Sequence, residues 1–214
     1  MNSHPLSDYL ALALTEEKAL EGITLRKTPI ADLHLPTGKL VASDCLAFFE
    51  PQPFATSFPC GTFPVTVTVA HDHNDQRIAF ATIRFRDSTP VTWEMLMFEG
   101  EEAGDLVDGE ISGYGVDSGT GCFLDASAAK VLARKLDKDE EFFHEILETL
   151  EKTYVPTWGW LNMPFGKGNL VAFSSGMGDG VYASYAGFDS NGLISVVVTD
   201  FSILPHGADG DHLT

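Results

Sequence analysis

The sequence predicts an α+β protein made mainly of antiparallel β-sheet, with two central helices and a short N-terminal helix. The order of elements is typical of this class: strand segments come first, two helices follow, and strand segments return. The turns that join the strand segments are short and polar, which favours hairpin pairing. At 214 residues and 44% hydrophobic, the chain is long enough to bury a sizeable core.

We expect three segments along the chain: 1–30 as an N-terminal helix with its lead-in, 31–203 as a single α+β domain, and 204–214 as a mobile tail. Ser7 as a cap, with Leu10 and Leu14 at helical spacing, predicts a helix over 7–21. Residues 22–64 contain many prolines and glycines, so short strands such as 39–42 are expected there instead of helices.

Strands are predicted on both sides of the helices, before them from residue alternation and after them mainly from turn residues. Val and Thr alternate over 65–70, a polar turn follows at 71–76, and 77–85 is apolar again, which predicts a hairpin. A further strand is expected over 91–98. Near the C-terminus, three strands over 169–174, 181–188 and 193–201 are separated by Gly- and Asp-rich turns, which predicts a meander.

Two helices are expected between these groups of strands. Asp125 is placed to cap a helix over 126–136. A second helix is predicted over 138–154, with Asp137 and Glu140 at the spacing of a capping box. Its apolar residues lie on one stripe, which is typical of a helix that packs on a core. They are Phe142, Phe143, Ile146, Leu147, Leu150 and Tyr154.

The charge balance excludes some partners and favours another. The chain has 13 Lys and Arg against 31 Asp and Glu, for a net charge of −18. Nucleic acid and anionic membrane surfaces need clustered Lys and Arg, so neither is expected as a partner. The acidic residues are concentrated between Glu99 and Glu151. This segment is either a solvated face or a docking surface for a basic protein partner.

The cysteines and the N-terminus indicate a cytoplasmic protein. Three cysteines without close pairing (Cys45, Cys60 and Cys122) resemble neither a disulfide framework nor a zinc site, so we expect reduced thiols. The N-terminus lacks the basic and apolar regions of a secretory signal, and no apolar run approaches the ~20 residues that span a bilayer. No cofactor and no metal ion is expected.

Two glycine-rich stretches contain the candidate site. Residues 113–125 read Gly-Tyr-Gly-Val-Asp-Ser-Gly-Thr-Gly-Cys-Phe-Leu-Asp, and residues 174–182 read Ser-Ser-Gly-Met-Gly-Asp-Gly-Val-Tyr. The candidate catalytic residues are Asp117, Cys122 and Asp179. The candidate ligand-binding residues lie in the same two turns: Gly119, Thr120, Gly121, Gly178, Asp179 and Gly180.

Several chemistries fit parts of these stretches. Asp117-Ser118-Gly119-Thr120 resembles the core of aspartic peptidases, which needs a second copy to share a proton. The same letters match a phosphate-binding hairpin of actin-like ATPases, a fold that needs a longer chain. Cys122 before a helix is a candidate nucleophile if one of the histidines (His34, His71, His73 or His144) supplies a base. The alternative for Asp117 is structural: its carboxylate accepts the amides of its own turn and ties the turn that leads into the helix.

Both stretches, together with Val-Val-Thr-Asp-Phe at 197–201, Thr37–Asp44 and Pro59–Val65, resemble a bacterial family, the domain of unknown function numbered 4241. The resemblance covers about residues 30–203 and implies the fold of that family, but no activity. Met177, Ala183 and Ala186 depart from its pattern, in which an aromatic residue, Pro and Trp are common. Cys45 and Cys60 stand where Pro is usual.

The leading functional hypothesis is a non-catalytic binding or interaction module. Its acidic surface would face a basic partner, as an immunity protein faces a cationic toxin. The alternative is a small hydrolase or transferase with a site near Asp117, Cys122 and Asp179. A third hypothesis is a structural subunit without a site.

Overall fold

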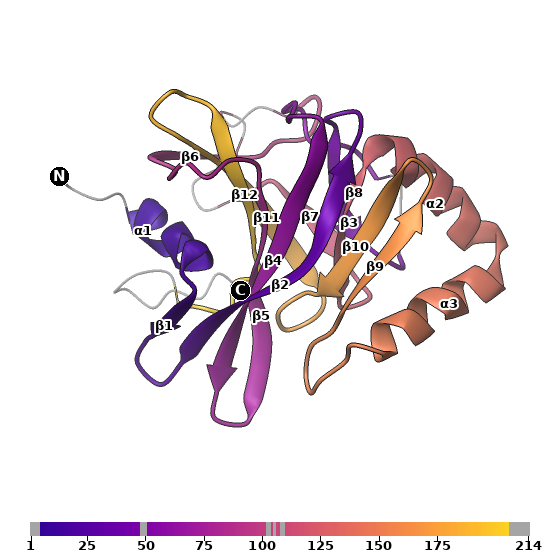
Figure 1. Cartoon of the computed structure of the whole chain (residues 1–214), viewed down its shortest axis with the longest axis horizontal. Helices are drawn as coiled ribbons and strands as arrows, with labels where there is room; N and C mark the ends of the chain where they lie inside the picture. The colour runs from indigo at the N-terminus through magenta and orange to yellow at the C-terminus, as the bar shows by residue number, and fades with distance from the viewer. Residues whose placement is uncertain (1–4, 48–50, 102–103, 105, 108–109, 206–214) are drawn as a thin grey trace.

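The computed structural model describes residues 5–47, 51–101, 104, 106–107 and 110–205. Within these residues the chain forms two antiparallel sheets and three α-helices (Figure 1). The α+β class with mainly antiparallel sheet, two central helices and a short N-terminal helix is therefore confirmed.

The larger sheet has eight strands in the described part of the chain, in the order β1-β2-β4-β5-β12-β11-β6, with β7 also paired to β11. Strands β6 and β7 lie one after the other along the same partner, because β6 pairs with 185–188 and β7 with 180–183. The bounds are β1 (Glu17–Ala19), β2 (Thr24–Leu35), β4 (Gly61–Asp72), β5 (Asp75–Arg84), β6 (Thr92–Met95), β7 (Gly113–Val116), β11 (Gly180–Phe188) and β12 (Ile194–Asp200).

The smaller sheet has four strands among the described residues, in the order β3-β8-β10-β9. Its central strands, β8 (Thr120–Asp125) and β10 (Gly168–Ser174), are almost wholly buried. The outer strands are β3 (Leu40–Asp44) and β9 (Trp160–Phe165).

The main core lies between the two sheets. Val67, Ile83 and Val197 from the larger sheet pack in one cluster with Phe123 and Phe173 from the smaller sheet. The last two rings meet edge to face, with centroids 4.9 Å apart. Alternate residues along each strand point to the opposite face, so each sheet also has an outer apolar face that needs a cover.

Helices cover both outer faces (Figure 1). Helices α2 (Ala126–Lys138) and α3 (Glu140–Glu151) pack Leu132, Phe142 and Ile146 onto the outer face of the smaller sheet. Helix α1 (Pro5–Ala11) and the 3₁₀ turn Leu12–Leu14 pack Leu10 and Ala13 onto the outer face of the larger sheet. The molecule therefore has four layers: helix, large sheet, small sheet, helices.

Several predicted elements are confirmed with small changes at their ends. Strands β4 and β5 pair as the hairpin that the Val/Thr alternation indicated. Asp125 caps α2 by accepting the amide of Ser127 at 2.8 Å. Helix α3 is present but begins later than predicted, and its cap is Asp139 instead of Asp137.

The N-terminal helix is shorter than predicted. It ends at Ala11, and residues 17–19 form the edge strand β1 instead of the last helical turn. Charged residues of this segment pair with β2: Glu17 lies 3.5 Å from Arg26, and Glu16 forms an ion pair with Lys27. Strand pairing therefore outweighs a weak helical pattern here.

The predicted C-terminal meander is wrong in one strand. Strands β11 and β12 pair with each other, but β10 belongs to the smaller sheet, between β8 and β9. The turn after β10 therefore crosses between the sheets and does not close a hairpin.

Two expectations reach the edges of the described residues. Leu204, which we placed in the tail, is buried, and the Tyr9 hydroxyl lies 3.4 Å from its carbonyl oxygen. Residues 206–214 lie outside the described residues, as do 102–103, 105 and 108–109 of the acidic segment. No helix in the described part of the chain is long and apolar enough to cross a membrane.

Candidate functional site

The two glycine-rich stretches are neighbouring crossings between the sheets. The chain passes from β7 in the larger sheet to β8 in the smaller sheet through residues 117–119, and returns from β10 to β11 through residues 175–179. The amide of Ser175 donates to the Gly119 carbonyl at 3.1 Å, which holds the two crossings side by side. Both use glycine at a positive φ, +67° at Gly119 and +54° at Gly176.

A buried carboxylate, Asp44 at the end of β3, organises the first crossing. Its Oδ2 accepts the amides of Asp117 and Ser118, each at 2.7 Å. Its Oδ1 accepts the Ser118 hydroxyl at 2.7 Å and the amides of Leu46 and Ala47 at 2.7 Å or less. Asp44 is only 2% exposed, so these five bonds replace the water that it gives up on folding.

The hydrogen bonds to Asp44 also set its charge state. Burial disfavours the ionised form, but the bonds from Ala47, Ser118, Leu46 and Asp117 outweigh it and hold the pKa of Asp44 below its ordinary value. The residue that accepts the amides of this turn is therefore Asp44. The expectation that Asp117 does so is wrong, because the Asp117 side chain is exposed and forms no hydrogen bond with any described residue.

The three candidate catalytic residues do not share a cleft. Asp117 and Asp179 are exposed at the two crossings, whereas Cys122 is fully buried below them in β8. The Cys122 thiol lies 3.8 Å from the carbonyl oxygen of Asp44. Burial, and then contact with the Cys45 thiol, raises the pKa of Cys122, which keeps the thiol protonated. No histidine in the described residues forms a hydrogen bond with it.

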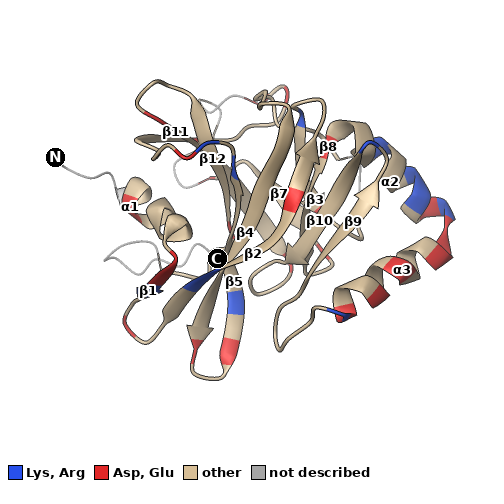
Figure 2. Ribbon diagram, viewed as in Figure 1, with Lys and Arg blue, Asp and Glu red and all other residues tan. Residues whose placement is uncertain are grey.

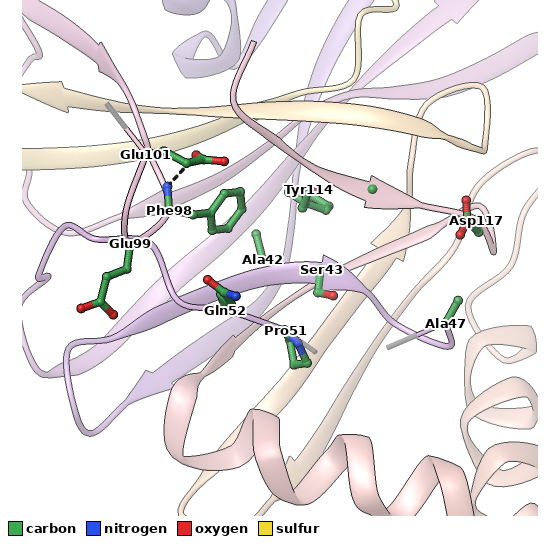
Figure 3. A pocket seen from close by; sticks show the side chains of 11 residues that line it. Ala42, Ser43, Ala47, Pro51, Gln52, Phe98, Glu99, Glu101, Tyr114 and Asp117 are labelled. Atoms are coloured by element: carbon green, nitrogen blue, oxygen red, sulfur yellow. Dashed lines mark hydrogen bonds between the residues drawn. The ribbon is translucent and has the colours of Figure 1, made fainter. Parts of the chain in front are cut away.

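An acidic hollow lies on one side of the first crossing, with a volume of about 410 Å³ (Figure 3). It is defined by Ala42, Ser43, Phe98, Glu99, Glu101, Tyr114 and Asp117. In Figure 3, Glu99 and Asp117 stand at opposite ends, with the Phe98 ring and Tyr114 between them. Glu101 is fixed in place because it accepts the Phe98 amide at 3.0 Å and the Ser112 hydroxyl at 2.7 Å.

The second hollow, here called the turn pocket, lies between the two crossings and the end of α3. It has a volume of about 260 Å³ and is defined by Arg77, Thr120, Tyr154, Ser174, Gly176 and Met177. Gly119 and Gly178 line it as well. Three of the predicted ligand-binding residues, Gly119, Thr120 and Gly178, therefore meet at one cavity.

The other predicted ligand-binding residues lie elsewhere. Gly121 is buried, and a Cβ atom there would meet the Tyr114 hydroxyl at 3.1 Å and Phe173 at 3.3 Å. Gly180 is the first residue of β11 and pairs with Val116. Neither Gly121, Gly180 nor Asp179 lines the two hollows in the described structure.

Sequence reasoning missed Asp44, Arg77 and Phe98. Asp44 does carry a signal, because an Asp that ends an apolar strand and begins a turn is placed to bond the next amides. Arg77 and Phe98 carry none, since only the folded chain brings them to Thr120 and Tyr114. The described residues contain no group of three or more His, Cys, Asp or Glu side chains that could hold a metal ion.

The exposed acidic residues of the helical layer form a separate surface. Along α3 the carboxylates of Glu140, Glu141, Glu145, Glu148 and Glu151 are exposed, and Figure 2 shows acidic positions along the whole helix. The basic residues of this layer lie mainly on α2, including Lys130, Arg134 and Lys138. None of these charged residues lines either hollow.

Comparison with known proteins gives one match. The model of a family described as "Protein of unknown function (DUF4241)" matches residues 33–199, which include both crossings and both sheets. Neither the curated proteins nor the solved structures contain a match to the chain.

Proposed function

The chain belongs to the DUF4241 family of proteins of unknown function, and we propose that it is a non-catalytic binding module whose acidic hollow receives a cationic side chain of a basic protein partner. An immunity-type role toward a cationic protein is one form of this function. Three reduced thiols, two of them buried, support action in the cytoplasm.

The observation that carries the proposal is the composition of the acidic hollow. Three carboxylates, those of Glu99, Glu101 and Asp117, border it, and no Lys, Arg or His is among the described residues that line it. Carboxylates without a basic neighbour create a negative potential that attracts a cation. A cationic group that entered the hollow would therefore offset the negative charge of these carboxylates.

The shape of the hollow favours an extended side chain over a free ion. Glu99 and Asp117 stand at its opposite ends and do not converge on one point (Figure 3). The Phe98 ring and Ala42 offer apolar contacts to the methylene stem of a Lys or Arg, whose charged end reaches a carboxylate. The face of Phe98 can add a cation–π contact of about 0.5–1 kcal/mol.

The geometry does not favour the alternative of a hydrolase or transferase. Asp117 and Asp179 are exposed, Cys122 is buried with a raised pKa, and no described group joins them in one cavity. A nucleophile must reach its substrate, and Cys122 does not reach the surface.

The test uses charge reversal with a matched control. Glu99→Lys and Asp117→Lys change exposed residues of the hollow, and Glu148→Lys makes the same change on α3, outside it. The ligand is a synthetic peptide rich in Lys and Arg, measured by calorimetry against a Gln-substituted peptide. Each hollow variant should weaken binding about tenfold, or about 1.4 kcal/mol, because a favourable contact becomes repulsive. The control should weaken it only about twofold, through the general field.

Binding to the unchanged protein should also fall steeply between 0.05 and 0.3 M salt, which are conditions of roughly 14 and 6 Å screening length. If Glu148→Lys weakens binding as much as Asp117→Lys, the attraction comes from net charge alone and the hollow is not the site. The proposal would also be contradicted if the peptide bound all three variants as tightly as it binds the unchanged protein.

A further inference from the structure

We propose that the turn pocket binds a small carboxylic acid with an aromatic or apolar body, and that Arg77 is the partner of its carboxylate. This site is distinct from the acidic hollow and does not depend on it. The two hollows have different lining residues and opposite charge preference.

The guanidinium of Arg77 is held in place but keeps free donors. Its Nε lies 3.0 Å from both carboxylate oxygens of Asp75, and the Thr157 hydroxyl donates to the same Asp75 at 3.0 Å. Its two terminal nitrogens donate to no described residue. The side chain is 27% exposed and lines the pocket. A fixed guanidinium with two free amino groups matches the two oxygens of a carboxylate.

The second crossing supplies further donors. The amide of Gly178 donates to the Ser175 carbonyl at 2.7 Å, which closes a four-residue turn. The amides of the two central residues, Gly176 and Met177, donate to no described residue. Across the pocket, the Thr120 hydroxyl is also without a described hydrogen-bond partner. An oxyanion beside Arg77 therefore has neighbouring donors that the fold leaves unused.

Apolar side chains stand exposed at the rim of the same pocket. Met177 is 70% exposed and Tyr154 is 57% exposed, and Leu150 lines the wall between α3 and the second crossing. Exposed apolar side chains that surround a cavity mark a binding site more often than ones scattered singly. Tyr154 and Met177 offer a flat ring and a polarisable thioether, which suit contact with an aromatic body.

Charge and size favour a carboxylate over a phosphate. Asp75 already offsets much of the Arg77 charge, and Asp179 is exposed beside Gly178. A single negative charge is accommodated by the unused donors, whereas a dianion would add repulsion from both carboxylates. The volume of about 260 Å³ also limits the ligand to a small molecule.

The test compares benzoate with its neutral isostere benzamide, titrated into the full chain and followed by NMR shifts of the Gly176 and Met177 amides. Benzoate should bind at least about tenfold more tightly than benzamide, because only the carboxylate pairs with Arg77. Phenyl phosphate should bind more weakly than benzoate.

Three variants locate the contact. Arg77→Gln should weaken benzoate binding about tenfold, and Arg134→Gln, the same charge change at an exposed position on α2, should leave it unchanged. Met177→Glu, at an exposed rim position that should not disturb folding, should weaken benzoate binding more than benzamide binding, because both ligands lose the thioether contact but only benzoate is repelled by the new carboxylate. Equal affinity for benzoate and benzamide, or no binding of either, would overturn the proposal. Tighter binding of phenyl phosphate would overturn the choice of a carboxylate.

Discussion

Asp44 has the structural role that the glycine pattern led us to assign to Asp117. Both residues sit at the first crossing, but the turn presents its amides inward, toward the end of β3. The carboxylate of Asp44 accepts these amides, whereas the carboxylate of Asp117, which belongs to the turn itself, is exposed to solvent. Asp117 is thereby free to contribute its charge to the acidic hollow.

Replacement of Asp44 should therefore be costly and replacement of Asp117 should not. In Asp44→Asn, the side-chain NH2 group replaces one carboxylate oxygen. It must then face at least two backbone N–H donors whose hydrogen bonds that oxygen accepts in the unchanged protein. We expect the free energy of unfolding to fall by about 3 kcal/mol. The melting temperature should fall on the order of 10 °C, since each kcal/mol is worth roughly 2–4 °C in a domain of this size.

Asp117→Ala is the matched control for this experiment. It removes an exposed carboxylate without described hydrogen bonds, so thermal unfolding should change by about 0.5 kcal/mol or less. A larger loss in Asp117→Ala than in Asp44→Asn would contradict the assignment of Asp44 as the organising residue.

At the scale of elements, the sequence pattern predicted the structure correctly where an element depends on residues close together in the chain. The β4–β5 hairpin and the start of α2 were predictable, because alternation, a polar turn and a cap residue act over a few positions. Strand β2 was not, since Pro29 lies within it and a register shift at 29–31 accommodates the missing amide. The crossing after β10 carries the chemistry of a hairpin turn, and no local signal tells which sheet the next strand joins.

The two helix caps provide a prediction at this scale. Asp125 is fully buried and accepts four hydrogen bonds: two from Ser127, which begin α2, and two from Thr37, which hold the β2–β3 connection. Asp139 is half-exposed, and among the described residues its carboxylate accepts a hydrogen bond only from the Phe142 amide, at 3.0 Å, with the Lys135 ammonium 3.8 Å away. Asp125→Ala should cost about 3 kcal/mol or more and Asp139→Ala about 1 kcal/mol, as chemical denaturation would show. Equal losses would mean that the Thr37 bonds add nothing.

At the scale of the whole molecule, the candidate site is a consequence of having two packed sheets. The chain must cross between them, and the two crossings at 117–119 and 175–179 lie side by side. From their glycines, the sequence predicted both crossings as tight turns, because such turns need positive φ, but it did not predict that the chain changes sheets there. It did not reveal the two hollows beside them, since Arg77, Phe98 and Tyr154 come from distant parts of the chain.

Acid should unfold the whole molecule through its buried carboxylates. Burial opposes ionisation of Asp125, as of Asp44, but hydrogen bonds from Ser127 and Thr37 hold the pKa of Asp125 below its ordinary value. A carboxyl group with a lower pKa in the folded state binds fewer protons there than in the unfolded chain, whose value is about 3.9. Its contribution to stability is therefore complete above that value and is lost as the pH falls through the folded pKa.

The net charge of −18 acts in the opposite direction, because protonation of surface carboxylates relieves repulsion as the pH falls. A comparison of the unchanged protein with Asp44→Asn cancels this shared background. The difference in their urea midpoints should be constant from about pH 6 to 5 and should narrow below about pH 4, because the unfolded chain then takes up a proton at Asp44 that the folded state does not bind. A difference that stays constant down to pH 3, while both proteins remain folded without urea, would show that Asp44 is not stabilised as a carboxylate.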